Sequence, residues 1–399
     1  MATTRLRFLT AGESHGPSLT GILEGMPAGL PLDEATIARD LARRQQGFGA
    51  GGRMKIERDH ARITAGVLAG TTTGAPIALS IENRDHAAWA RRDIAPMTVP
   101  RPGHADLTGA VKYGYGDLRL SLERASARET AMRVAIGAVC RTLLAEFGVT
   151  VGGYVTSIGT VHVPPSVSPV APASFVERFA AAERSDVRCH DEQVAARMHE
   201  AIQATIGARD TIGGTIEVAA LHVPPGLGSH VHWDRRLGAR IAAALMSIHA
   251  VKGVEIGDGF AATQRPGTLA HDVLHLEQTA IASHTNRAGG IEGGISNGAP
   301  IVARIAMKPI ATTLEPLASV DLATGQAAIT RYERSDFCQV PRAVPIAEAM
   351  LALVLADALL EKLGGDSIAE LRPRFEALRA MRLEDLSMNN QPWRFGYET

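Results

Sequence analysis

Four short segments combine charged side chains with glycine, serine or proline, and they are where this sequence could carry chemistry. A histidine in such a loop can transfer a proton or donate a hydrogen bond to an anion. An arginine can hold a carboxylate or phosphate group through two parallel hydrogen bonds. The segments are "TAGESHGPS" with Ser14 and His15, "VPRPGHAD" with Arg101 and His104, "LERASARE" with Arg124, Ser126 and Arg128, and "RYERSDFC" with Arg334 and Asp336.

No single segment is decisive, because a lone loop histidine is more often structural and most charged residues only solvate a surface. Their shared setting favours a site: several arginines lie in loops that small residues pack closely. Pro100 and Pro102 restrict the loop around Arg101, and Ser126 begins a helix, where free N–H groups favour phosphate. We therefore predict a site for a small polyanion, gripped by Arg44, Arg53, Arg101, Arg128 and Arg334.

The glycines in "RRQQGFGAGGRMK" match G-x-G-x-x-G at Gly47, Gly49 and Gly52, the pattern of a dinucleotide-binding turn. That turn needs a strand before the first glycine and a helix after the third. Instead, "LDEATIARDLARRQ" predicts an amphipathic helix that ends before the glycines, with Asp33 as its N-cap. The alternation downstream favours strands. We expect an anion-binding loop here and not a dinucleotide site.

The composition excludes several classes of function. The chain has 399 residues, a net charge of −1 and 4% aromatic residues, so it lacks the basic and aromatic pattern of nucleic-acid binders. Cys140, Cys189 and Cys338 are far apart, which argues against a disulfide framework or a zinc site. No metal is expected.

Two features bear on location. The first residues contain no apolar segment of the kind that directs secretion. The most apolar helix candidate, "PIAEAMLALVLADALLEKLGG", is interrupted by Glu348 and Asp357. It reads as a buried core helix that is too polar to span a bilayer. A cytoplasmic protein without membrane contact is expected.

The elements that must position these residues mix strands and long helices. Helices are expected at about 127–147, 191–206, 233–251, 345–363 and 367–382, and strands near 5–12, 18–25, 61–68, 76–82, 154–163, 214–223, 300–307 and 327–334. Hairpins separated by long helices favour the α+β class over an alternating parallel sheet. Residues 163–175, rich in proline, read as a surface loop.

One internal similarity is visible. Residues 65–77, "AGVLAGTTTGAPI", and residues 289–301, "GGIEGGISNGAPI", share G-A-P-I and the earlier glycines. A duplicated half and independent use of the same turn chemistry both account for this similarity.

At this point the motifs together resemble those of a known family, the chorismate synthases. The similar segments follow one another in the family's order over nearly the whole chain: "GESHGPSLTGILEGMP", "RPGHAD", "ERASARETAMR", "HAVKGVEIGDGF", "NRAGGIEGGISNGAPI", "MKPIAT" and "RSDFCQVPRAVPIAEAM". The resemblance implies a lyase of the shikimate pathway, which leads to the aromatic amino acids. Such an enzyme converts 5-enolpyruvylshikimate 3-phosphate to chorismate by 1,4-anti elimination of phosphate. It requires reduced FMN without net redox change, and NADPH acts only indirectly, as the reductant of the flavin.

The resemblance also implies an architecture and partners. It predicts a single domain over residues 1–399 with an internally pseudo-repeated β-α-β sandwich, a flexible tail at about 383–399, and a homotetramer. It also allows for a separate flavin reductase as a partner. An NADPH-using flavin oxidoreductase and an anion- or RNA-binding module are the alternatives.

Roles follow residue by residue from the resemblance. His15 is expected at the departing phosphate, His104 as the acid that protonates reduced flavin, and Asp336 as an aid to deprotonation near flavin N5. The expected substrate-binding residues are Ser14, Arg44, Arg53, Arg101, Arg128 and Arg334. The expected flavin-binding residues are Arg44, Arg124, Ala125, Ser126, His249, Ala250, Gly293, Lys308, Pro309, Ile310, Ala311, Thr312 and Arg334.

The sequence departs from the family pattern at three of these segments. Ala50 stands where relatives carry an arginine in the glycine loop, which puts one phosphate contact and any nicotinamide contact in doubt. His249 stands where many relatives have asparagine, and Phe337 follows the R-S-D motif where a smaller residue or proline is commoner.

Overall fold

The computed structural model describes residues 5–50, 58–164, 170–333 and 335–397. Its first sheet is antiparallel, with strand order β1-β2-β6-β3. The strands are β1 (Arg7–Ala11), β2 (Ser18–Glu24), β3 (Ala61–Ala65) and β6 (Ile77–Glu82). Along β2, Leu19 and Leu23 are buried while Thr20 and Ile22 are exposed. This period of two gives the sheet one face toward the core and one toward solvent.

The second sheet is antiparallel too and has strand order β10-β15-β9-β7-β8. The strands are β7 (Thr150–Ile158), β8 (Val161–His162), β9 (Gly214–Leu221), β10 (Val251–Ile256) and β15 (Ile301–Met307). The neighbours Tyr154 and Val155 on β7 are both buried, and they belong to two different apolar clusters. Both faces of this sheet are therefore covered.

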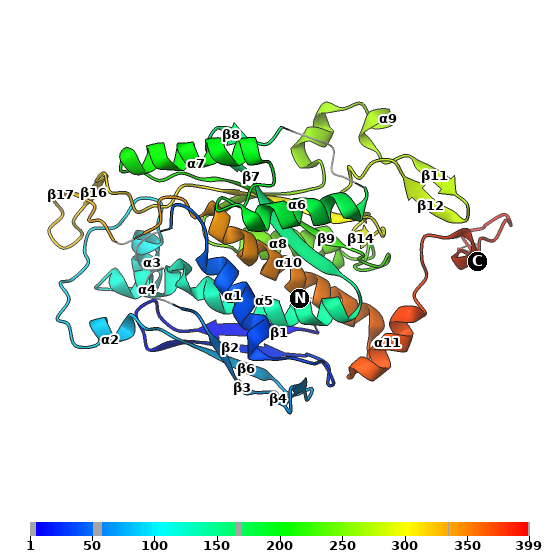
Figure 1. Cartoon of the computed structure of the whole chain (residues 1–399), viewed down its shortest axis with the longest axis horizontal. Helices are drawn as coiled ribbons and strands as arrows, with labels where there is room; N and C mark the ends of the chain where they lie inside the picture. The colour runs from blue at the N-terminus through cyan, green and yellow to red at the C-terminus, as the bar shows by residue number, and fades with distance from the viewer. Residues whose placement is uncertain (1–4, 51–57, 165–169, 334, 398–399) are drawn as a thin grey trace.

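A layer of helices lies between the two sheets (Figure 1). It contains α1 (Glu34–Gln45), α5 (Thr130–Glu146), α8 (Leu237–Met246) and α10 (Val340–Leu363). The helices α5 and α10 cross closely, because a Cβ placed on Gly137 would lie 2.2 Å from Cβ of Ala349. By length and composition α10 could cross a membrane, but 94% of its most apolar stretch is buried in the protein, as predicted for a core helix.

Helices outside this layer complete the surface (Figure 1). They are α6 (Pro172–Arg184), α7 (Glu192–Gly207) and α11 (Ile368–Glu376), with the short α9 (Gly267–Ala270). Two of them, α6 and α7, cover the second sheet (Figure 1). Small hairpins are formed by β11 (Leu274–Glu277) with β12 (Ala280–Ser283) and by β16 (Ala318–Val320) with β17 (Ala327–Ile329). Short 3₁₀ segments occupy Trp233–Arg235, Gly259–Gln264 and Leu383–Asp385.

The structure confirms most expected elements and corrects others. The Asp33 side chain accepts a hydrogen bond from the Thr36 N–H, which confirms the N-cap of α1. The loop expected over 163–175 is wrong at its end: α6 begins at Pro172, because proline is compatible with the first turn of a helix. The last strand is shorter than predicted and ends at Ile329. The α+β class is confirmed.

The two similar segments have the same local structure. In the first, β4 (Val67–Leu68) and β5 (Thr71–Thr72) form a hairpin that leads into β6. In the second, β13 (Ile291–Glu292) and β14 (Ile295–Ser296) form a hairpin that leads into β15. The Thr72 hydroxyl accepts from Leu30 N at 2.9 Å and donates to Pro27 O at 2.6 Å. The Ser296 hydroxyl accepts from Leu227 N at 2.9 Å and donates to Pro224 O at 2.7 Å.

Candidate active site

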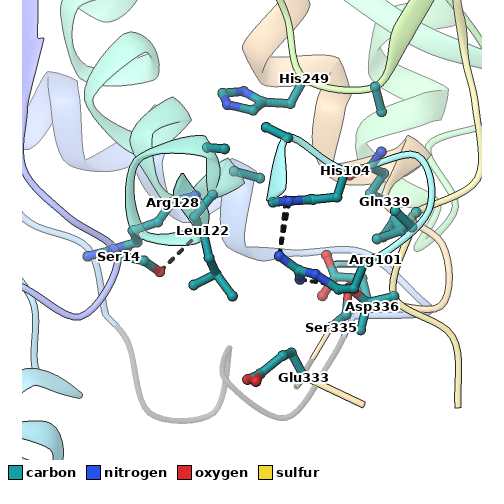
Figure 2. Close-up of a pocket in the computed structure, with 18 of the residues that line it drawn as sticks. Ser14, Arg101, His104, Leu122, Arg128, His249, Glu333, Ser335, Asp336 and Gln339 are labelled. Atoms are coloured by element: carbon teal, nitrogen blue, oxygen red, sulfur yellow. Dashed lines mark hydrogen bonds between the residues drawn. The ribbon is translucent and has the colours of Figure 1, made fainter. Parts of the chain in front are cut away.

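One cavity of about 400 Å³ gathers most of the predicted site residues (Figure 2). The segments that form its wall are far apart in the sequence: the β1–β2 loop, the end of α1, the loop before α3 (Asp106–Tyr113), α4 (Arg119–Ala125), the 3₁₀ turn η2 (Ala127–Glu129), the loops that follow α8 and β15, and the turn into α10. The predicted residues at the wall are Ser14, His15, Arg44, Arg101, His104, Ala125, Ser126, Arg128, His249, Ala250, Lys308, Pro309, Ile310, Ala311, Thr312 and Asp336.

Four predicted residues are not placed at this wall. Arg124 is exposed and its guanidinium donates to Thr10 O at 2.9 Å, away from the cavity lining. Gly293 lies in the tight turn between β13 and β14, outside the lining residues. Arg53 and Arg334 lie outside the described residues. The roles of these four residues stay predictions.

His104 is held by a buried carboxylate. Its Nδ1 lies 2.5 Å from Oδ1 of Asp106, which is fully buried at the start of α3. Asp106 also accepts from Arg101 Nε at 2.8 Å and from Arg101 Nη2 at 2.9 Å. Burial raises the pKa of Asp106, but the hydrogen bonds from Arg101 and His104 outweigh it and hold that pKa well below its usual value. An ionised carboxylate only accepts, so Nδ1 of His104 carries the proton.

His15 is held in a similar way by a residue from α4. Its Nδ1 lies 2.7 Å from Oε1 of Glu123, and its backbone N–H donates to Oε2 at 2.8 Å. The ring of Trp89, in α2 (His86–Trp89), lies against the imidazole with centroids 4.2 Å apart. The neighbouring Ser14 is buried, and its hydroxyl accepts from the Ser126 hydroxyl at 3.1 Å. The imidazole is thus fixed at one edge and on one face.

Two buried arginines meet at one carboxylate. Asp59 accepts from Arg128 Nη1 at 2.5 Å and from Arg44 Nη1 at 3.5 Å. Arg44 also donates to the Thr130 hydroxyl at 2.9 Å. Burial and the nearby Arg342 and Arg128 lower the pKa of Arg44 to about 9. Arginine remains protonated at neutral pH even so, and the cluster therefore concentrates positive charge that an anionic ligand would neutralise.

Asp336 forms an ion pair with Arg342 at the turn into α10. It accepts from Arg342, and Arg342 in turn donates through Nε to the backbone oxygen of Arg44 at 3.2 Å. Arg342 therefore joins the Asp336 segment to the end of α1. Across the cavity, Lys308 donates to Gly103 O at 2.5 Å and closes the loop that carries His104.

The base of the glycine loop is attached to the Asp336 segment. The backbone N–H of Phe337 donates to Gly49 O at 2.9 Å, and the Phe48 ring stacks on His199 of α7 with centroids 3.7 Å apart. Gly49 has φ +86°, and a Cβ there would lie 3.1 Å from Cys338 Cβ. A helix, α1, precedes these glycines, as predicted.

Sequence reasoning missed the residues that support this site. They are Asp59, Trp89, Asp106, Glu123, Gln339 and Arg342. Asp106 and Glu123 lie within quoted motifs, so a search for acceptors beside each histidine could have found them. Asp59 gives no such local signal, because its arginines are 15 and 69 residues away in the sequence.

Two polar atoms at the wall bear on the fit of a flavin. Among the described residues, neither Nδ1 of His249 nor Nε2 of Gln339 has a hydrogen-bond partner, although both are buried. Burial lowers the pKa of His249, so its imidazole is neutral near pH 7. Buried polar atoms without partners cost about 1–3 kcal/mol each. The wall therefore suits a ligand whose ring edge carries carbonyl and N–H groups, as a flavin ring does.

Comparison with known proteins identifies the family over nearly the whole chain. The chorismate synthase family model matches residues 6–360. Relatives named chorismate synthase occur in Syntrophotalea carbinolica, 51% identical over 94% of this chain and 97% of the relative, and in Aquifex aeolicus, 51% identical over 94% and 98%. A crystal structure of a chorismate synthase superimposes with a TM-score of 0.78 at 46% identity, covering 93% of this chain and 96% of that chain. The chain therefore belongs to the chorismate synthase family.

Proposed function

We propose that this protein is a phosphate lyase that converts 5-enolpyruvylshikimate 3-phosphate to chorismate in the shikimate pathway. The observation that carries the proposal is the cavity itself, where two carboxylate-bound histidines and four arginines face one space in a member of this family. The substrate has two carboxylates and a phosphate. Arg44, Arg101, Arg128 and Arg342 supply matching positive charge.

We propose reduced FMN as the cofactor. The residues that would hold it are the predicted flavin-binding residues that line the cavity. Nδ1 of His249 and Nε2 of Gln339 would hydrogen-bond to the flavin ring. When bound, reduced flavin supplies the electron density that an allylic phosphate needs as it leaves, since the C6 hydrogen is not acidic. NADPH would serve only to reduce the flavin, directly or through a separate reductase.

The protein's own residues would bind the anion and manage protons. In its doubly protonated form, His104 would keep one proton on Nδ1 for Asp106 and present the other on Nε2 as the acid. His15, protonated on both ring nitrogens, would donate through Nε2 to the departing phosphate, and the Ser14 hydroxyl lies beside it. Asp336, oriented by Arg342, would assist removal of the C6 hydrogen. Arg53 and Arg334 are proposed to complete the anion site.

Anaerobic incubation tests the function. The protein is mixed with substrate in the presence or absence of dithionite-reduced FMN, and chorismate is followed by absorbance. We expect turnover only with reduced FMN, with far more chorismate formed than flavin oxidised. Equal product without flavin would refute the cofactor. One NADPH oxidised per product would favour a flavin oxidoreductase instead.

We also propose the finer architecture. The halves from β1 to α5 and from β7 to α10 are proposed to be related by duplication. The support is that the order β1-β2-β6-β3 corresponds to β7-β9-β15-β10, and that Thr72 and Ser296 make equivalent hydrogen bonds. A cytoplasmic homotetramer of β-α-β sandwich subunits is proposed from the family resemblance.

A further inference from the structure

Glu123 is an acidic residue at the active site to which the proposed reaction gives no role. It lies on α4, 108 residues from His15 in the sequence, and contacts the β1–β2 loop that carries His15. Its side chain is only 15% exposed and the His15 side chain only 17% exposed. A carboxylate so little hydrated needs strong donors.

Both oxygens of Glu123 receive their hydrogen bond from the same residue. Oε1 lies 2.7 Å from the ring Nδ1 of His15, and Oε2 accepts the His15 backbone N–H at 2.8 Å. The backbone oxygen of Glu123 also accepts the Ser14 N–H at 3.0 Å. Three bonds therefore fix the position of the His15 backbone and the direction of its ring with respect to α4.

The protonation state of Glu123 is set by this contact. Burial raises its pKa, but the hydrogen bonds from the His15 side chain and backbone lower it further, so the pKa lies below the usual value. The carboxylate is therefore ionised near neutral pH and can only accept. The proton of neutral His15 must consequently lie on Nδ1.

The other ring nitrogen is left for the ligand. Within the described part of the chain Nε2 of His15 makes no hydrogen bond, and the ring lines the cavity. Trp89 lies against the ring face at a centroid distance of 4.2 Å, and His86 contacts the His15 backbone oxygen at 2.8 Å. The ring can neither turn over nor leave without breaking these contacts.

We propose that Glu123 is the positioning residue of His15: it holds a proton on Nδ1 and directs Nε2 to the substrate's phosphate, so that the second proton, once the ring is doubly protonated, is donated from Nε2. The inference rests on the proposed function, because it assigns His15 a task in that reaction. The arrangement parallels His104 with Asp106, so in the part of the chain that the structure describes His15 and His104 each have an Nδ1 acceptor, unlike His249 at the same wall. Glu123 differs from Asp106 in that no arginine hydrogen-bonds to its carboxylate among the described residues.

Glu123→Gln tests the proposal. A glutamine has one acceptor oxygen, so it cannot accept from both the backbone N–H and Nδ1, and its amide favours the wrong tautomer. In the enzyme with reduced FMN we expect kcat to fall about 10-fold or more, with a smaller change in KM. The matched control is Glu34→Gln. Glu34 also accepts from a histidine ring, His60 at 3.0 Å, and from a backbone N–H, Ile63 at 2.8 Å, but it lies outside the cavity.

Two further readouts separate positioning from folding. Imidazole ¹⁵N NMR, with the His15 signal assigned from its loss in His15→Asn, should show the Nδ1–H form in the parent and a shifted tautomer in Glu123→Gln. In a double-mutant cycle, Glu123→Gln should add little to the loss caused by His15→Asn. An unchanged His15 spectrum, or full additivity of the two rate losses, would overturn the proposal. If the parent enzyme itself makes no chorismate, the proposed function fails, but the NMR result still tests the pairing of Glu123 with His15.

Discussion

Two histidines at the cavity wall, His15 and His104, are each paired with an ionised acid, and that pairing determines which ring nitrogen is available. Asp106 holds His104 and Glu123 holds His15, so in each case Nδ1 is committed; Nε2 of His15 remains, whereas Nε2 of His104 lies 3.4 Å from Arg101 Nη2. A general acid works best when its proton is aimed before the ligand arrives. Each of these two histidines therefore depends on its acidic partner to be oriented for proton transfer.

His104→Ala should lower the rate of the chemical step by about 100- to 10,000-fold, the usual effect of losing a general acid. The loop would survive, because Arg101 still binds Asp106 and Lys308 still binds Gly103. Single-turnover stopped-flow at saturating substrate and reduced FMN measures the step, and a thermal melt reports the fold. His162→Ala, an exposed histidine outside the cavity, is the control. A much less stable protein with a near-normal chemical rate would remove His104 from the mechanism.

Asp106 should make the stability of the protein fall at acid pH. Its folded pKa lies below the unfolded value of about 3.8, so its stabilising effect is complete above that value and is lost as the pH falls. The free energy of unfolding of the parent should therefore begin to drop below about pH 5 and go on dropping below about pH 3, with a slope of up to about 1.4 kcal/mol per pH unit from this one group, and the melting temperature should follow. Asp106→Asn should melt at a lower temperature at pH 7 and show a shallower acid slope.

The comparison variant for that pH series is Asp366→Asn, whose side chain is 98% exposed. It should follow the parent at every pH. Parallel slopes for the parent and Asp106→Asn would show that the buried carboxylate is not the titrating group.

At the level of elements, the site depends on how closely the central helices approach. Gly137 of α5 faces Ala349 of α10, and a Cβ there would lie 2.5 Å from the Ala349 Cα. The turn that carries Asp336 leads directly into α10, and the η2 turn that carries Arg128 leads directly into α5. A change in the separation of these helices would therefore alter the cavity.

Gly137→Ala should destabilise the protein by about 1–3 kcal/mol, because the added methyl group overpacks the helix crossing. Urea denaturation measures the loss, and weaker substrate binding should accompany it. The matched control is Gly207→Ala at the end of α7, where a Cβ would meet nothing within 4 Å. That variant should be neutral or slightly more stable. Equal behaviour of the two variants would contradict the close crossing.

The sequence could predict the elements and the motif residues, but not all the partners that support them. Ser14, His15, Arg101 and His104 stand out because glycine and proline mark their loops locally. Asp59 does not stand out, because the contact that gives it a role joins residues 69 positions apart. Helix α6 was missed because a proline-rich run precedes it and its Pro172 looks like loop chemistry. Local pattern predicts local structure, whereas charge pairing depends on the tertiary fold.

At the level of the whole molecule, the two sheets share one helix layer and one main apolar cluster. Such a shared core should make the halves unfold together. We expect variants that retain only Trp89, from the first half, or only Trp233, from the second, to give the same urea midpoint, coincident with the loss of far-UV circular dichroism. Two separated midpoints would show that the chain comprises more than one folding unit.

The place of α10 in the chain has a consequence for synthesis on the ribosome. This helix packs against α5, β7 and β9 at once, yet it is translated after all of them. Until it emerges, the parts of α5 and of the second sheet that face α10 are exposed, and the wall that Asp336, Gln339 and Arg342 provide does not exist. A nascent chain therefore cannot recruit substrate or flavin to help it fold. Ligand binding consequently cannot protect these apolar surfaces from aggregation during that interval.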